Sequence, residues 1–384
     1  MLPNRAGCGR AGAGVNARAA APPARAPRGI AWQRLPLLAL GFVALVVGVA
    51  AGLARLGWTM PERAGAALHG ALMVCGFFGV VIALERAVAI GRPWAYAAPL
   101  LAGLGTLAAL SAAAVLAPWL YLAASLVLLA ASLDVLRRQR AGFTLVIALA
   151  AACWMIGTAQ WAAGAPIHRV VGWWLAFLVL TIAGERLELS RFAPPAATAV
   201  RLFFGIVAAL LAALLAWAQP WAPRLGGVAL VALALWLLRH DIARRTVRQQ
   251  GLVRFIAVCL LSGYLWLALG GAVMAFAGLA PGAGAAYDAA LHALLVGFVF
   301  SMVFGHAPII FPAVLRVTMP YDAGFYVPLA LLHAALALRV AGDAAGVYAW
   351  TRWGGLLTAL ALLAFVLNTV RSVARGARAG RAAR

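Results

Sequence analysis

The sequence has few charged residues and no lysine. Among its 384 residues only 10% are charged, nine are acidic, and all 31 basic residues are arginine. Soluble proteins carry roughly 25% charged residues, whereas here 66% of the residues are hydrophobic and the mean hydropathy is +0.98. A water-soluble globule of this length cannot bury so much apolar surface. We therefore predict an integral membrane protein with lipid around most of the chain.

Other absences exclude several functional classes. Cys8, Cys75, Cys153 and Cys259 are scattered and form no Cys-x-x-Cys pair, so no disulfide framework is implied. The arginines lie between apolar runs and at the termini rather than along one stripe, which excludes nucleic acid as a partner despite the net charge of +22. The chain has no nucleotide-binding loop, no c-type haem attachment motif and no long soluble region. Any redox partner would therefore be a separate molecule.

The apolar runs predict an all-α fold, a polytopic bundle of about twelve transmembrane helices. Residues 1–34 are mostly Ala, Gly, Pro and Arg and are predicted to be a disordered cytoplasmic tail. Residues 35–373 form the predicted transmembrane domain, and 374–384 a basic cytoplasmic tail. Each run is long enough to approach the ~30 Å of a hydrocarbon core. The predicted spans are 35–56, 65–90, 95–116, 118–136, 143–163, 168–189, 198–218, 222–238, 254–279, 287–315, 325–341 and 346–370.

The basic residues predict the orientation, because short cytoplasmic loops are enriched in arginine. The even-numbered connections are rich in arginine, and the odd-numbered ones carry few. Both terminal segments are also arginine-rich. We therefore predict a multi-pass protein of a bacterial-type inner membrane with both termini in the cytoplasm. The arginines of the even-numbered connections are Arg92, Arg137, Arg138, Arg140, Arg191, Arg239, Arg244, Arg245, Arg248 and Arg316.

Three histidines recur with a period of four helices. His69, His168 and His292 lie near the outer ends of the second, sixth and tenth spans. The second and sixth spans also end alike, at Glu85-Arg86 and Glu185-Arg186. This pattern predicts three similar units of four helices each.

His69 and His292 are the predicted haem ligands. Their helices run in the same direction and place both residues at equal depth, and imidazole is a common axial ligand of haem iron. Small side chains near them would let a flat macrocycle or another helix approach closely. The alternative is tight helix packing, with each histidine bonded to a neighbouring carbonyl. The small residues are Gly70, Ala71, Gly76, Gly79, Ala293 and Gly297.

The tenth span carries a second feature. His306 follows His292 by 14 residues and lies on nearly the same helix face, deeper in the membrane. Pro308 and Pro312 come next, and each frees a carbonyl group that needs another partner. His333 on the eleventh span is predicted at a comparable depth. His306 and His333, with His168, are candidate ligands of a second metal such as copper, and the alternative is a structural kink.

Two of these helices resemble a known family. The run HGALMVCGF at 69–77 is similar to the His-x-x-Leu-Met-Val-x-Gly-Phe run of the NnrS-type haem–copper membrane proteins, and the run HALLVG at 292–297, followed by Gly305 and His306, resembles their corresponding helix. The first run is also similar to the second helix of haem–copper oxidase subunit I. That superfamily has twelve helices in three arcs of four. The resemblance implies that His69 and His292 bind haem, with His306 a weaker candidate.

The resemblance does not extend to a complete copper–haem centre. An oxidase has a His-Pro-x-x-x-Tyr motif on its sixth helix and a His-His pair on its seventh. Here the sixth span offers only His168, and the seventh contains no histidine.

The leading hypothesis is a haem-binding integral membrane protein linked to respiratory or nitrogen-oxide metabolism. The sequence does not decide whether it catalyses a reaction. Two other classes fit the same pattern: a secondary transporter with a midplane site at the kinked tenth helix, and a structural or assembly protein without chemistry.

Overall fold

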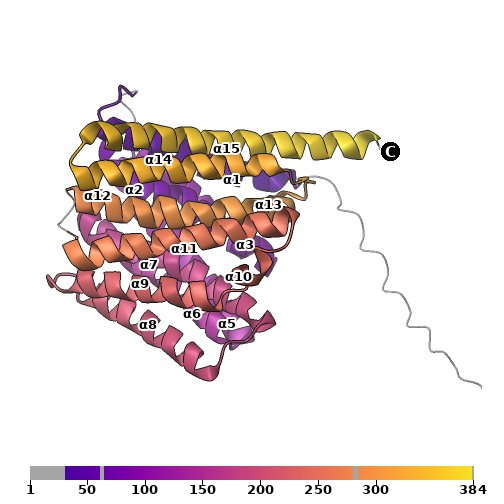
Figure 1. The fold of residues 1–384 in the computed structure, drawn as a ribbon. Helices are drawn as coiled ribbons and strands as arrows, with labels where there is room; N and C mark the ends of the chain where they lie inside the picture. Colours follow the sequence, from indigo (N-terminus) through magenta and orange to yellow (C-terminus); the bar gives the residue numbers. More distant parts are fainter. Residues whose placement is uncertain (1–30, 61–64, 280–283, 383–384) are drawn as a thin grey trace, which may run out of the picture.

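A computed structural model describes residues 31–60, 65–279 and 284–382, and within these ranges the chain is helical without a β-strand. Eleven of the described helices are long and apolar enough to cross a membrane, which confirms the polytopic all-α bundle. Figure 1 shows their axes running side by side. The helices are α1 (Leu35–Arg55), α2 (His69–Ala71), α3 (Gly79–Ile90), α4 (Ala97–Ala109), α5 (Ala117–Arg138), α6 (Gly142–Ala162), α7 (Ile167–Leu189), α8 (Ala197–Leu215), α9 (Ala222–His240), α10 (Ala243–Thr246), α11 (Gly251–Ala277), α12 (Ala285–His292), α13 (Ser301–Leu315), α14 (Tyr326–Ala345) and α15 (Tyr348–Ala382).

Two of the spans are composite and contain a π-helical segment. Leu72–Phe78 joins α2 to α3, and Ala293–Phe300 joins α12 to α13. These are the two spans whose length predicts a bend or protrusion. The α-helix of α13 continues through Pro308 and Pro312 to Leu315.

The predicted third span, 95–116, is shorter than expected. It is built by the 3-10 turn Pro93–Tyr96 and by α4, which ends at Ala109. The Ser111 hydroxyl donates to the Ala108 carbonyl at 3.0 Å and accepts from the Ala113 amide at 3.2 Å. A serine side chain that bonds to the local backbone competes with helix continuation. The helix therefore ends here and the predicted residues 114–116 belong to the start of the next span.

Both predicted tails are helical in the parts that the structure describes. Residues 1–30 lie outside the described ranges, but Trp32–Arg34 form a 3-10 turn that leads into α1. At the other end α15 continues as one helix to Ala382, through the residues predicted as a tail. Its 35 residues extend about 50 Å, more than the ~30 Å of hydrocarbon. Figure 1 shows this helix running past its neighbours.

The second, sixth and tenth spans lie at the centre of the bundle. In the most apolar stretch of α7, 83% of the residues are buried, and the value is 61% for each of the two composite spans. None of the other described spans exceeds 56%. The three predicted units correspond to α1–α5, α6–α9 and α11–α15. Each unit contacts the next, because α5 packs against α6, α9 against α11, and α15 against α1. This arrangement agrees with three units around a common centre, and their superposition stays a prediction.

The described cysteines pack in the core as the sequence predicts. Cys75, Cys153 and Cys259 are buried and free. The Cys75 thiol accepts a hydrogen bond from the Trp154 indole at 3.3 Å, which links the second span to α6.

Candidate functional site

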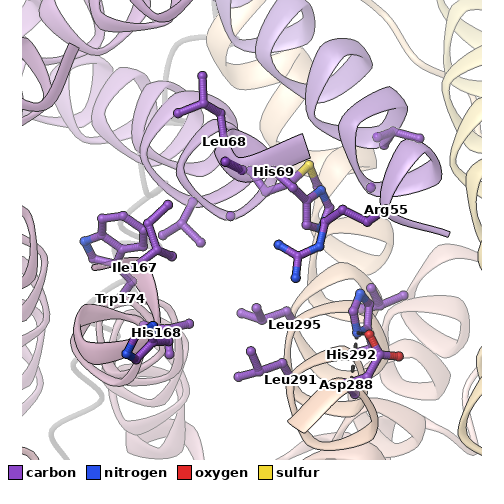
Figure 2. Close-up of a pocket in the computed structure, with 18 of the residues that line it drawn as sticks. Arg55, Leu68, His69, Ile167, His168, Trp174, Asp288, Leu291, His292 and Leu295 are labelled. Carbon is purple, nitrogen blue, oxygen red and sulfur yellow. Dashed lines mark hydrogen bonds and ion pairs between the residues drawn. The ribbon is translucent and has the colours of Figure 1, made fainter. Parts of the chain in front are cut away.

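A cavity of about 790 Å³ lies at the end of the bundle opposite the C-terminus of α15. It is lined by residues of α1, α2, α7, α12, α14 and α15, and among them are all three histidines of the predicted repeat, His69, His168 and His292. We call it the histidine cavity. Figure 2 shows His69 and His292 on one side of it and His168 across from them on α7.

His69 is held in place by α1. Its Nδ1 donates a hydrogen bond to the Gly48 carbonyl oxygen at 2.7 Å. One turn further on, Gly52 leaves room for the imidazole, because a Cβ atom there would lie 2.8 Å from His69 Cε1. The hydrogen bond to the Gly48 carbonyl therefore fixes the ring, and the absence of a side chain at Gly52 gives it the space it occupies.

His292 is held by its own helix. Its Nδ1 lies 2.8 Å from the Asp288 carbonyl oxygen and 3.3 Å from the Asp288 carboxylate. That carboxylate also accepts two hydrogen bonds from Arg339 of α14, at 2.7 and 2.8 Å. Only 8% of Arg339 is exposed. An ion pair between a buried arginine and a partly exposed aspartate thus lies next to the imidazole of His292.

The hydrogen bonds determine the tautomer of both rings. A carbonyl oxygen can only accept, so Nδ1 must carry the proton in His69 and in His292. The lone pair of a neutral ring is then on Nε2. Among the described residues, neither Nε2 has a hydrogen-bond partner. A histidine that binds a metal donates its other ring N–H in this way, to a carbonyl or a carboxylate.

The two imidazole rings lie near one another and are almost parallel. Their ring centroids are 6.4 Å apart, and their planes differ by 14°. Two metal–imidazole bonds of about 2 Å, together with the two ring radii, come to roughly 6 Å. The separation is therefore close to that of two imidazoles sharing one metal ion.

A π-helical segment follows each of the two histidines. It begins three residues after His69 and directly after His292. π-Helical segments inside α-helices are rare and occur frequently at functional sites. Among the described spans, only these two contain a π-helical segment, and in both it lies next to a histidine of the cavity.

The floor of the cavity is aromatic and its rim is charged. Phe78 and Phe300 line it toward the membrane interior, with ring centroids 5.2 Å apart. Trp174 of α7 closes another side. Arg55, at the end of α1, projects into the cavity in Figure 2. The site thus combines an apolar body with a cationic group near its opening.

The predicted second metal pair is not assembled. His306 Nδ1 donates to the Met302 carbonyl at 2.6 Å, and its Nε2 lies 3.1 Å from Arg186. His333 is held on both sides by α11, because its Nδ1 accepts from Trp266 at 2.9 Å and its Nε2 lies 3.0 Å from the Ser262 hydroxyl. Both ring nitrogens of each residue are therefore engaged. No group of three potential metal ligands is found in the described ranges.

The small residues were predicted to let a macrocycle or another helix approach, and three of the glycines lie against side chains of neighbouring helices. An added Cβ would meet Trp154 at Gly79, Ala44 at Gly76 and Trp266 at Gly297. Among the predicted glycines, only Gly70 lines the cavity.

The Asp288 carboxylate offers a first prediction. We expect Asp288→Asn to lower the affinity for a metal held by His292 by about 10–100-fold, because such supporting groups fix the ring and raise its basicity. If the metal is redox-active, the loss of a negative charge should also raise its midpoint potential. A binding titration measures the affinity and a redox titration the potential. Asp134→Asn is the control, since Asp134 forms only a partly exposed helix pair with Arg138. An unchanged affinity and potential would contradict a supporting role for Asp288.

A comparison with curated proteins finds no match to this chain. A comparison with protein families matches residues 34–374, from the residue before α1 to a point within α15. The matching family is described as a domain of unknown function, DUF8744, and the chain belongs to it.

Proposed function

We propose that this integral membrane protein binds haem in the histidine cavity, with His69 and His292 as the two axial ligands. The observation that carries the proposal is the pair of neighbouring, nearly parallel imidazoles with Nδ1 on carbonyl acceptors and Nε2 without a partner among the described residues. The two Nε2 atoms are not among the buried unpartnered atoms, so they are accessible from the cavity and available to a ligand there.

The cavity suits such a ligand in size and chemistry. Its volume of about 790 Å³ falls within the roughly 300–1,000 Å³ of small-molecule and cofactor sites. The phenylalanines and Trp174 offer apolar surface to a macrocycle. Arg55 would pair with acidic groups at its edge, since guanidinium binds carboxylates strongly.

Two axial imidazoles favour electron transfer over ligand binding at the metal. When bound, haem supplies one-electron redox chemistry, and its potential depends on the axial ligands and their hydrogen bonds. His69 and His292 would hold and orient the haem. The Asp288–Arg339 pair would tune how strongly the His292 imidazole donates electrons to the iron. On the basis of the resemblance to NnrS-type proteins, we extend the proposal to a role in respiratory or nitrogen-oxide metabolism, with a separate redox partner. Copper is not part of this proposal, because the rings of His306 and His333 are engaged by other residues.

The test is the visible spectrum of the purified protein. We expect the absorption bands of a low-spin, bis-imidazole haem, which shift on reduction, and about one haem per chain by extraction. Protein purified after expression with ample haem supply, yet without these bands and unable to take up added hemin, would contradict the proposal.

The structure gives less support to a transporter with a midplane site. Pro308 and Pro312 do not line the histidine cavity, and α13 remains helical through both residues. The cavity lies toward one end of the bundle. A structural or assembly role without chemistry predicts no haem and is tested by the same spectrum.

The arginine distribution supports a bacterial-type inner membrane with both termini in the cytoplasm. The histidine cavity would then open on the outer side. We expect reporter fusions at 111–113 and 280–286 to report an external position, and fusions at 138–141 and 244–250 a cytoplasmic one. A cytoplasmic report from 280–286 would reverse the side on which the cavity opens.

A further inference from the structure

The ion pair next to His292 has a third ionisable neighbour, Asp343. This residue lies one turn after Arg339 in α14, and residues at this spacing share one face of a helix. Asp343 does not itself line the histidine cavity. Its carboxyl group is in hydrogen-bonding contact with that of Asp288 on α12. Two acidic groups and one guanidinium therefore meet where α12 packs against α14.

The described surroundings of Asp343 offer its carboxyl group one hydrogen-bond donor. The Thr351 hydroxyl of α15 donates to Oδ1 at 2.9 Å. The other oxygen, Oδ2, is buried and has no donor among the described residues. In the same ranges no arginine or histidine nitrogen lies within 4 Å of either oxygen. An ionised carboxylate with one hydroxyl donor and one buried, unpartnered oxygen would be poorly stabilised.

The neighbouring arginines are engaged elsewhere. Arg339 donates to Asp288 through Nε and Nη2, at 2.7 and 2.8 Å. Arg352, which follows Thr351 on α15, lies with its guanidinium 4.1 Å above the Trp58 ring. The cations of the two helices packed around Asp343 are therefore already used by another acid or by an aromatic ring.

The remaining titratable side chains at these helix ends do not compensate a charge on Asp343. His292 of α12 contacts Asp288, with 3.3 Å between Nδ1 and the carboxylate, and has no such contact with Asp343 in the described structure. Tyr287 of α12 and Tyr348 of α15 are phenols, which are neutral at about pH 7. They supply no positive charge.

We propose that Asp343 is a protonated carboxylic acid at neutral pH and donates a hydrogen bond to the Asp288 carboxylate. Ionised carboxylates only accept hydrogen bonds, so two of them in contact need one proton between them. Asp288 keeps the negative charge, because both of its oxygens hold the Arg339 guanidinium. The proton then belongs to Asp343 and lies on Oδ2, since Oδ1 accepts from Thr351.

This proton-binding site would regulate the histidine cavity. Loss of the proton from Asp343 adds a negative charge beside the Asp288–Arg339 pair, which contacts His292. A negative charge there stabilises the oxidised state of a metal held by His292, so the midpoint potential should fall as the pH rises through the titration of Asp343. This consequence rests on the proposed haem site, whereas the proton on Asp343 does not.

The test is infrared difference spectroscopy of the purified protein, wild type minus Asp343→Asn, in water and in heavy water. Exposed aspartates are ionised at about pH 7, so a protonated-carboxyl band there, sensitive to heavy water and absent from Asp343→Asn, is the expected result. Thr351→Val should keep the band and move it to higher frequency, because the carbonyl oxygen loses its donor. Asp134→Asn is the matched control and should give no such difference band, since Asp134 pairs with Arg138.

Asp288→Asn removes the acceptor and releases Arg339, which then has Asp343 one turn away as its partner. Asp343 should ionise, and the band should disappear at neutral pH. A band that persists unchanged in this variant, or that Thr351→Val leaves at its wild-type frequency, contradicts the assignment. Wild-type protein with heavy-isotope aspartate carboxyl groups needs no variant, and the absence of an isotope-shifted protonated-carboxyl band overturns the proposal by itself.

The infrared result is independent of haem. Protein that shows the band but takes up no haem would leave the proton on Asp343 in place and contradict only the haem site. Protein that binds haem but lacks the band would contradict only the protonated Asp343.

Discussion

Replacing either His69 or His292 by alanine is expected to abolish the bis-imidazole spectrum of the bound haem. Each residue would supply one of two axial bonds, and changes to mere supporting groups already cost about 10–100-fold in metal affinity. We therefore expect a loss of more than about 100-fold for each ligand. Haem content per chain and the reduced-minus-oxidised spectrum measure it.

Three controls separate ligation from folding. His168→Ala removes a histidine of the same cavity that stands apart from the pair, and His240→Ala removes one that packs on Trp236 at the end of α9. Both should keep the wild-type spectrum. In His69→Gly and His292→Gly, free imidazole should restore a low-spin spectrum by filling the space. Failure of rescue in both variants, or an unchanged spectrum in both alanine variants, would contradict axial ligation.

The apolar runs were sufficient to predict the bundle, because a span in lipid must be both long and apolar. The error in the third span has a local cause. The sequence from 95 to 116 is apolar throughout, but the Ser111 hydroxyl binds the backbone and ends the helix. Hydropathy averaged over a window does not detect a single side chain that competes with the helix.

The site was predicted in part. The pair His69 and His292 was predicted as one site, and the structure brings both to one cavity together with His168, which the sequence analysis assigned to a second metal site. The acceptor of His69 is a backbone carbonyl on another helix, and no side chain signals it in the sequence. The π-helical segments depend on a shift of backbone hydrogen bonds and likewise leave no sequence signal.

Asp288 could have been identified from the sequence. It precedes His292 by four residues, and residues at this spacing lie on the same face of a helix. Arg339 illustrates the opposite case. It lies near the end of the predicted span 325–341, inside α14, and binds Asp288. Its role depends on the contact between α12 and α14, which only the folded structure establishes.

Gly52→Val is expected to lower haem affinity by roughly 10–100-fold, although Gly52 binds nothing itself. An added Cβ would stand 2.8 Å from Cε1 and 2.9 Å from Nδ1 of His69, nearer than side chains pack. The imidazole must then rotate away and lose its bond to the Gly48 carbonyl. Overpacking costs about 1–3 kcal/mol, and each 1.4 kcal/mol is tenfold in affinity. Gly205→Val on α8 is the matched control, because nothing lies within 4 Å of its added Cβ. The haem spectrum and a hemin titration compare the two variants. Equal affinities would mean that the position of the His69 ring does not matter for binding, which is incompatible with axial ligation by that residue.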